Sequence, residues 1–265
     1  LKKIKPDLVV SFGGYISVPV IISAKIFRIK SITHEQTLTI SMSTKINSYF
    51  VDKIALSFPY NNTVPLPPKK IVITGNLIRR EVFNHLDSKY RPLVSPNIPL
   101  IYITGGNQGS SFINNLIFKL LGHLKNYSLI HHTGINDCPE ATKFCSQYPN
   151  YFPTEYVAAA DIGWVFHHAD IIISRAGANT CQEIDILNKK AILIPLPGTQ
   201  QNEQLLNAQW LNLDHPQTTI TLDQDTLTSS LLLSTIKKLL KVKSPPPIKT
   251  PVTNHPLVKL IHEMV

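Results

Sequence analysis

The sequence has few cysteines, and they do not form a pattern that would stabilise a fold. Its 265 residues include Cys138, Cys145 and Cys181, an odd number without the spacing of metal ligands. A disulfide scaffold is therefore not expected, and a reducing cytoplasm is the setting that suits such a chain. Charged residues are also scarce, at 16% against 43% hydrophobic residues. This balance excludes a disordered chain and predicts a large buried core.

Long apolar runs are missing as well. No stretch of about 18 uninterrupted apolar residues occurs, so a transmembrane helix is not predicted. No secretory signal pattern is found at the start of the chain. The sequence begins with Leu1 rather than methionine and enters an apolar strand pattern within a few residues. We expect from this that the N-terminal part of the protein lies upstream of Leu1.

The formal net charge is +9, from 26 lysines and arginines against 17 acidic residues. Two interpretations fit this charge: an ordinary lysine-rich surface, or attraction to an anionic partner such as a phospholipid surface or a phosphorylated substrate. Nucleic acid is not favoured as a partner, because the basic residues are scattered and no aromatic-basic RNA motif is present.

Short apolar segments alternate with helix-like segments along the chain. Alternation of this kind predicts an α/β protein with parallel sheets, and continuously apolar strands indicate that helices cover both faces. Strands are predicted at 8–12, 31–33, 53–56, 70–73, 100–104, 129–132, 171–174 and 191–194, and helices at 18–27, 40–49, 111–121 and 180–187.

Prolines mark the expected boundaries. Pro92, Pro96 and Pro99 favour a first domain over 1–92 and a second over 93–247. A proline run at 245–247 breaks the chain before a C-terminal segment, 248–265. Within that segment we expect a helix that packs back on the first domain.

Glycine is rare, and its positions are informative. Of 11 glycines, nine stand where a predicted strand ends. Ligands of open α/β sheets bind beyond the carboxyl ends of the strands, and glycine there permits close approach of a ligand. Any one of these glycines fits an ordinary turn, but nine together favour a nucleotide-type site. The nine are Gly13, Gly14, Gly75, Gly105, Gly106, Gly109, Gly134, Gly177 and Gly198.

Two glycine-containing turns are the main candidates for phosphate binding. Residues 104–110 (TGGNQGS) lie between a strand and a helix, where backbone N–H groups can face a phosphate, although no Walker or dinucleotide motif is present. Residues 174–183 (SRAGANTCQE) have the same setting. There, Thr180 and Glu183 permit two interpretations: a capping box that only starts the helix, or a phosphate contact followed by a carboxylate for ribose hydroxyls.

Three further groups carry weaker signals. An amide-rich stretch at 195–208 suits a neutral polyhydroxyl partner, or is a solvated loop. Arg79 follows a strand and is either a diphosphate clamp or a surface arginine. The pair His34-Glu35 lacks the spacing of a zinc site and is more typical of a structural role.

Taken in order, these motifs resemble the MurG-type N-acetylglucosaminyltransferases of glycosyltransferase family 28, and the resemblance covers residues 7 to about 240. It implies a GT-B fold, with two Rossmann-like domains of which the first is incomplete here. It also implies transfer of N-acetylglucosamine, with inversion, from UDP-N-acetylglucosamine to undecaprenyl-pyrophosphoryl-muramyl-pentapeptide. The location implied is the cytoplasmic face of the bacterial membrane, with peripheral attachment to an anionic surface. The matching stretches are Val10–Pro19, His34–Gln36, Thr74–Arg79, Thr104–Gly109, His131–Gly134, Ala169–Glu183 and Ile194–Ala208.

The resemblance assigns roles to individual residues. Arg79 would hold the donor diphosphate, Val157 or Tyr156 would contact uracil, Glu183 would bind the ribose hydroxyls and Gln204 the sugar hydroxyls. No Asp-x-Asp motif or cofactor motif is present, and arginine and helix N-termini are able to carry the diphosphate charge instead of a metal. The implied substrate-binding set is Arg79, Asn107, Val157, Ala178, Asn179, Thr180, Cys181, Gln182, Glu183 and Gln204, with Thr37 and Asn207 as further candidates.

The sequence also departs from the family pattern. Thr37, Asn107 and Leu77 stand where the family usually has asparagine, serine and proline. The family's N-terminal glycine-rich loop, whose histidine is a candidate general base, has no counterpart in these residues. We therefore expect the chain to bind the donor but to transfer sugar poorly unless the missing part is supplied.

Several alternatives stay open at this point. The chain could be another GT-B enzyme, such as a glycolipid glucosyltransferase or a UDP-N-acetylglucosamine 2-epimerase, or a non-catalytic subunit of a split enzyme. The stretch Val18–Lys30 mixes apolar and basic residues. It fits either a membrane-docking surface or an ordinary buried helix with a basic end.

Overall fold

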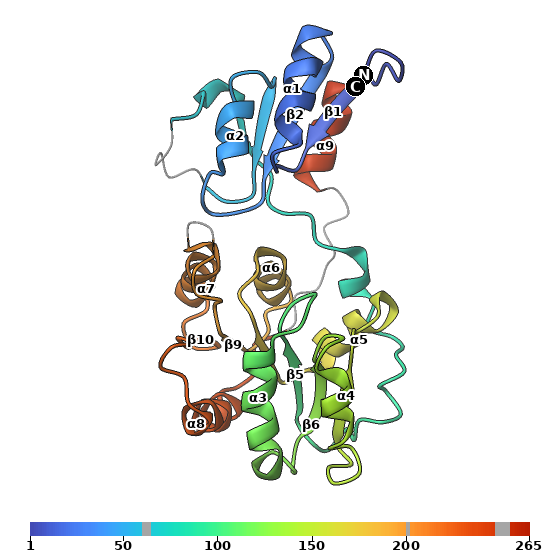
Figure 1. The fold of residues 1–265 in the computed structure, drawn as a ribbon, viewed down its shortest axis with the longest axis vertical. Helices are drawn as coiled ribbons and strands as arrows, with labels where there is room; N and C mark the ends of the chain where they lie inside the picture. Colours follow the sequence, from blue (N-terminus) through green and yellow to red (C-terminus); the bar gives the residue numbers. More distant parts are fainter. Residues whose placement is uncertain (60–64, 200–201, 247–254) are drawn as a thin grey trace. The chain divides into compact units, whose positions relative to one another are not determined.

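The computed structural model of the chain describes residues 1–59, 65–199, 202–246 and 255–265. The chain divides into two units (Figure 1): unit 1 is Leu1–Leu77 with Val252–Val265, and unit 2 is Ile78–Pro251. Each unit is built on a parallel sheet, of four strands in unit 1 and six in unit 2. The predicted α/β class with two parallel sheets is thereby confirmed.

Unit 1 has a sheet in the order β1-β2-β3-β4, with all neighbours parallel. Helices cover both of its faces. On the third strand, Ile54 packs with Ile21 of the first helix, whereas Ala55 packs with Leu257 of the C-terminal helix. The elements are β1 (Leu8–Ser11), α1 (Ser17–Ile26), β2 (Lys30–Glu35), α2 (Met42–Asn47), β3 (Lys53–Leu56), η1 (Pro68–Lys70), β4 (Ile71–Ile73) and α9 (Pro256–Met264).

The C-terminal helix α9 joins the two ends of the chain in unit 1. The Lys30 ammonium group donates to the Met264 carbonyl oxygen at 2.9 Å, and Nε2 of His255 donates to the Asn76 carbonyl oxygen at 2.8 Å. Figure 1 shows α9 beside β1, with the N- and C-termini close together. The fold of unit 1 therefore needs residues from both ends of the sequence.

Unit 2 has the sheet order β10-β9-β8-β5-β6-β7, again all parallel. The chain runs outward from β5 through β6 to β7, then crosses to the other side of β5 and continues from β8 to β10. This is the Rossmann order, with its switch point between β5 and β8. The strands are β5 (Leu100–Thr104), β6 (Ser128–His132), β7 (Tyr151–Thr154), β8 (Ile171–Ser174), β9 (Ala191–Leu193) and β10 (Thr219–Thr221).

Two hydrophobic layers sandwich the sheet of unit 2. Along β5, Tyr102 packs with Phe166 on one face, whereas Ile101 and Ile103 pack with Ile117 on the other. None of the described helices is long and apolar enough to cross a bilayer. The helices are η2 (Arg80–Phe83), α3 (Ser111–Leu120), η3 (Leu121–His123), α4 (Cys138–Thr142), α5 (Ala159–His168), α6 (Ala178–Ile186), α7 (Glu203–Asp214) and α8 (Ser229–Lys241).

The division between the units lies after Leu77, whereas the sequence placed the domain boundary after residue 92. The reason is that the intervening segment packs on α5. Val82 is fully buried in the unit 2 core. A Cβ atom added to Gly163 would lie 2.0 Å from the Asn84 carbonyl oxygen, so only glycine permits this contact. Oδ1 of Asp161 accepts a hydrogen bond from the Ser88 hydroxyl at 2.7 Å.

Candidate functional site

A pocket lies at the carboxyl ends of β5 and β6, beside the switch point of the unit 2 sheet. Open α/β sheets bind their ligands at this position, because two loops diverge there and leave a crevice. The pocket gathers four of the residues predicted to bind the donor: Arg79, Asn107, Val157 and Thr180. Its remaining lining residues are Tyr102, Thr104, Gly106, His132, Tyr156, Ile162 and Phe166.

The turn after β5 is held in place by the protein itself. Gly109 has a φ of +78°, and a Cβ atom there would lie 2.0 Å from the Thr133 carbonyl oxygen, so the turn presses directly on the one that follows β6. Ser110 caps α3, because its hydroxyl accepts from the Ile113 N–H at 3.5 Å. The same hydroxyl accepts from the Arg175 guanidinium at 2.9 Å. This turn is therefore a rigid wall of the pocket.

The turn after β8 leads into α6 without any cap. Gly177 is the N-cap residue and has no side chain to cap the helix, and no described side chain bonds the N–H groups of the first turn. Thr180 is the third residue of the helix, and the capping box with Glu183 is not formed. Uncapped N–H groups at a helix N-terminus, together with the helix dipole, favour a bound anion.

Glu183 is engaged by Arg79 instead. The Arg79 guanidinium donates from Nε to one carboxylate oxygen at 2.6 Å and from Nη2 to the other at 2.9 Å. The Glu183 side chain is only 4% exposed, against 37% for Arg79. Burial raises the pKa of Glu183, and Arg79 opposes this shift. Burial alone would lower the pKa of Arg79, but the bonds to Glu183 raise it. The residues predicted to hold ribose and diphosphate thus hold each other.

The rest of the predicted α6 set has mixed surroundings. Ala178 and Asn179 form the first turn of the helix, and Asn179 is exposed. Cys181 is buried in the core, which raises the pKa of its thiol to about 12. Gln182 is largely buried. Neither Cys181 nor Gln182 is among the residues that line the pocket.

The two amides predicted to read the sugar brace loops of unit 2. Oε1 of Gln204 accepts from the Leu196 N–H at 2.9 Å. Asn207 is completely buried, and its side chain donates to the Ala176 carbonyl oxygen at 3.1 Å. Asn207 therefore fixes the turn between β8 and α6, and the predicted sugar contacts of these two residues stay predictions.

Thr37 and the His34-Glu35 pair lie in unit 1. The Thr37 hydroxyl lies 2.6 Å from the Thr39 carbonyl oxygen and 3.0 Å from a Glu35 carboxylate oxygen. The other oxygen of Glu35 accepts from the Ser41 N–H at 2.9 Å. Nε2 of His34 lies 3.1 Å from the Gly75 carbonyl oxygen. These bonds hold the loop after β2, and the donor contact predicted for Thr37 stays a prediction.

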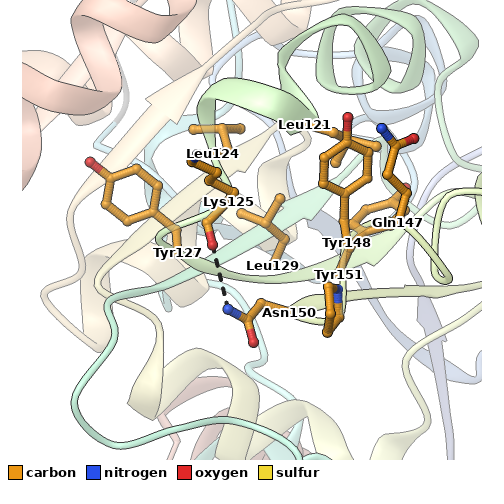
Figure 2. Close-up of a pocket in the computed structure, with 10 residues that line it drawn as sticks. Leu121, Leu124, Lys125, Tyr127, Leu129, Gln147, Tyr148, Asn150 and Tyr151 are labelled. Carbon is orange, nitrogen blue, oxygen red and sulfur yellow. Dashed lines mark hydrogen bonds between the residues drawn. The ribbon is translucent and has the colours of Figure 1, made fainter.

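Two other features of unit 2 lie away from this pocket. Among the described residues, Asp185, Asp214 and His215 form the single group with metal-ligand geometry, and His215 bonds Asp185 at 2.6 Å. Figure 2 shows a hollow at the amino ends of β6 and β7, lined mainly by leucine and tyrosine side chains. The dashed line in Figure 2 marks the hydrogen bond that the Asn150 side chain donates to the Lys125 carbonyl oxygen at 3.4 Å.

His132 is one of the pocket-lining residues to which the sequence assigned no role. His132 ends β6, is 3% exposed and lies against the ring of Tyr156, with ring centroids 5.4 Å apart. The sequence placed it in a matching stretch without giving it a role. Its position at a strand end directly before a glycine turn was the signal available.

Comparison with known proteins assigns both parts of the chain to one family. The glycosyltransferase family 28 C-terminal domain matches residues 100–257, and the family's N-terminal domain matches residues 1–56. A relative in Borreliella burgdorferi is 35% identical over 244 residues and is named UDP-N-acetylglucosamine–N-acetylmuramyl-(pentapeptide) pyrophosphoryl-undecaprenol N-acetylglucosamine transferase. The alignment covers 91% of this chain but 64% of the relative, so the chain spans somewhat less than two thirds of its length.

Solved structures support the fold. The crystal structure of MurG from Acinetobacter baumannii superposes with a TM-score of 0.68 at 23% identity, covering 99% of this chain and 76% of that one. A UDP-GlcNAc 2-epimerase from Neisseria meningitidis, solved with UDP-GlcNAc, reaches 0.63 at 15% identity and covers 100% and 77% of the two chains. At these identities the two structures show a shared GT-B-like fold. The domain matches and the bacterial relative identify the chain as a MurG-type member of glycosyltransferase family 28.

Proposed function

We propose that this chain binds UDP-N-acetylglucosamine in the pocket at the carboxyl ends of β5 and β6, as the donor half of an inverting N-acetylglucosaminyltransferase. The acceptor would be the lipid-linked muramyl-pentapeptide that appears in the name of the bacterial relative. The product would be the disaccharide-lipid precursor of peptidoglycan. No residue of this chain is proposed as the general base.

The observation that carries this proposal is that the uncapped N-terminus of α6 and the guanidinium of Arg79 contribute to one pocket. A diphosphate needs several N–H donors and a cation, and the α6 turn with Arg79 and Thr180 offers both. Val157 and Tyr156 supply an apolar side where a uracil ring would fit. The pocket therefore has one end for each part of a nucleoside diphosphate.

The Arg79–Glu183 ion pair offers one partner for the diphosphate and one for the ribose of the donor. In the proposed complex the diphosphate takes over Arg79, and the ribose hydroxyls donate to the Glu183 carboxylate. Each charged group then exchanges one charged or polar partner for another, so neither is left buried and unpaired. Uridine alone leaves the Arg79 charge with its original partner.

Calorimetry with UDP and uridine tests this donor site. Arg79→Ala should weaken UDP binding more than uridine binding, because only UDP carries the diphosphate. Glu183→Ala should cost both ligands about 1–3 kcal/mol, the contribution of hydrogen bonds to a charged acceptor. Equal losses for Arg79→Ala would remove the diphosphate assignment, and unchanged binding by a folded Glu183→Ala would remove the ribose role.

Turnover assays separate the three functional alternatives. A transferase forms a glycosylated lipid only when both UDP-N-acetylglucosamine and the lipid-linked muramyl acceptor are present. A 2-epimerase releases or isomerises the sugar without any acceptor, and its fold similarity makes this control necessary. A non-catalytic subunit binds UDP but turns over neither substrate.

We also propose peripheral attachment of unit 1 to an anionic membrane through α1. Only Ile21 and Ala24 of this helix are buried, whereas Ile16 is 83% and Ile26 71% exposed. Basic side chains lie at its end, including Lys25. Exposed apolar groups with adjacent cations fit a surface of anionic lipids. Co-sedimentation should require anionic vesicles and should weaken in Ile16→Ser/Ile26→Ser; equal binding to neutral vesicles would contradict the proposal.

A further inference from the structure

His132 is a buried polar side chain that lines the donor pocket with one ring nitrogen unused. Only 3% of the residue is exposed, and Nε2 makes no hydrogen bond of normal geometry with any residue that the structure describes. The Glu155 carbonyl lies close enough to favour the protonated ring, but burial has the larger effect and lowers the pKa of His132. A buried nitrogen without a proper partner is costly, so its presence in a pocket indicates a ligand contact.

The other ring nitrogen fixes how the imidazole is used. Nδ1 lies 3.2 Å from the Thr104 hydroxyl. That hydroxyl already accepts from the Gly106 N–H at 3.1 Å, so its own proton is available for Nδ1. In the tautomer in which Nδ1 accepts that proton, the neutral ring carries its own proton on Nε2 and presents a donor.

The direction of this donor separates it from the phosphate turn. Nδ1 faces Thr104, at the start of the glycine turn after β5, and Nε2 lies on the other side of the ring. The Tyr156 ring packs edge-on against the imidazole, and Tyr156 and Val157 line the same pocket. An uncharged N–H donor there matches an uncharged acceptor, and the phosphates have Arg79 and α6 as stronger partners.

We propose that His132 reads the nucleobase, by donating a hydrogen bond from Nε2 to a carbonyl oxygen of uracil. This inference rests on the proposed function and adds a base-contacting residue to it. Thr104 acts as a positioning residue, because its hydroxyl holds the ring in the donor tautomer. The contact gives the pocket a preference for bases with a carbonyl group at that position.

The test compares UDP and uridine binding by wild-type protein, His132→Phe and His132→Gln. The phenylalanine variant keeps the ring shape but has no donor, so both ligands should bind about three- to tenfold more weakly. The glutamine variant keeps an N–H donor and should retain most of the affinity. Exposed His123 offers a matched control, because His123→Gln should change neither affinity.

Each outcome decides the matter. Unchanged binding of both ligands by a folded His132→Phe overturns the inference while leaving the donor site intact. A loss confined to UDP assigns His132 to the phosphates and also overturns it. Wild-type protein that binds neither ligand sinks the proposed function itself. Should His132→Phe not fold, ¹⁵N spectra of the wild-type imidazole replace it: the Nε2 signal must shift on addition of uridine, and an unshifted signal refutes the contact.

Discussion

Helices α3 and α6 start at equivalent places, after the neighbouring strands β5 and β8, yet their first turns are finished in opposite ways. Ser110 caps α3 with its own hydroxyl, whereas Gly177 leaves α6 without a side-chain cap. The buried Arg175 reinforces the first arrangement by donating to Ser110. One helix start is thus closed by protein groups, and the other is left open.

The difference shows how one sheet edge separates support from recognition. A capped start has used part of its N–H capacity, so it is suited to shaping the pocket wall. An uncapped start keeps that capacity for an anion at some cost in helix stability. The cation beside the uncapped helix is Arg79, and its guanidinium is hydrogen-bonded to the Glu183 carboxylate.

The largest effect on stability is expected from breaking the Arg79–Glu183 ion pair beside α6. Arg79→Ala should lower the free energy of unfolding by about 2–3 kcal/mol, because it leaves the nearly buried Glu183 carboxylate without its cation. Urea unfolding measures this, with exposed Arg80→Ala as the matched control. The double variant Arg79→Ala/Glu183→Gln should recover most of the loss. A double variant no more stable than Arg79→Ala would show that the lost packing of Arg79, not the stranded charge, is the cause.

The closed side should respond to acid through His131. This ring is fully buried between the Tyr151 hydroxyl and Oδ1 of Asn114, at 2.8 and 2.9 Å. Burial lowers its pKa from 6.5 to about 3. Below about pH 6.5 the unfolded chain binds a proton at this histidine, whereas the folded protein does so only near pH 3. The free energy of unfolding is therefore unaffected by this residue above pH 6.5 and falls as the pH drops toward 3.

Between pH 6.5 and 5 this residue should cost roughly 1–2 kcal/mol of unfolding free energy. His131→Gln should be less stable at pH 7.5 but should show a shallower decline in urea unfolding at lower pH. His167, whose pKa burial lowers to about 4, adds a similar slope to both proteins. Identical slopes for the two proteins would contradict the assignment to His131.

Removing the cap of α3 should have a smaller effect. Ser110→Ala should lower the free energy of unfolding by about 1 kcal/mol, because the Ile113 N–H and the Arg175 guanidinium each lose an acceptor. The adjacent, exposed Ser111→Ala should change stability by less than about 0.5 kcal/mol. UDP affinity should hold in both variants; a large loss in Ser110→Ala alone would mean that the Ser110 hydroxyl itself is needed for ligand binding.

Adding an N-cap side chain to α6 should give the smallest change in stability but a clear change in UDP affinity. Gly177 has φ −64° and ψ 145°, and an added Cβ atom would meet nothing within 4 Å. Gly177→Asp should therefore cap α6, raise the free energy of unfolding by about 0.5 kcal/mol and weaken UDP binding about tenfold by charge repulsion. Gly177→Ala, which cannot cap, is the control. Undiminished UDP binding by Gly177→Asp would place the diphosphate elsewhere.

The sheets could be predicted where strands are short, apolar runs between turn residues. The ranges 53–56, 100–104 and 171–174 coincide with β3, β5 and β8. β7 and α5 were not predicted. Pro153 interrupts the β pattern of β7, which is tolerated because β7 is an edge strand. Asp161 to Phe166 of α5 are all buried, so this helix has no polar face to reveal its period.

The site could be predicted in outline only. Parallel strands share one carboxyl edge, so turns separated by many residues were expected to meet there. Pairing between side chains has no such rule. Arg79 precedes η2 and Glu183 lies on α6, 104 positions further on, and the sequence pattern does not encode that these two elements meet. The sequence likewise does not show that Nδ1 of His132 contacts the Thr104 hydroxyl while Nε2 is left without a partner among the described residues.

The return of α9 to the sheet of unit 1 has a consequence for biosynthesis. Unit 2 is one continuous stretch of polypeptide, whereas unit 1 needs strands from the beginning of the chain and a helix from its end. On the ribosome, unit 2 has all its residues while one face of the unit 1 sheet still lacks Leu257, Leu260 and Met264. Synthesis of unit 1 therefore starts before that of unit 2, but unit 1 can complete its fold only after unit 2 has been synthesised.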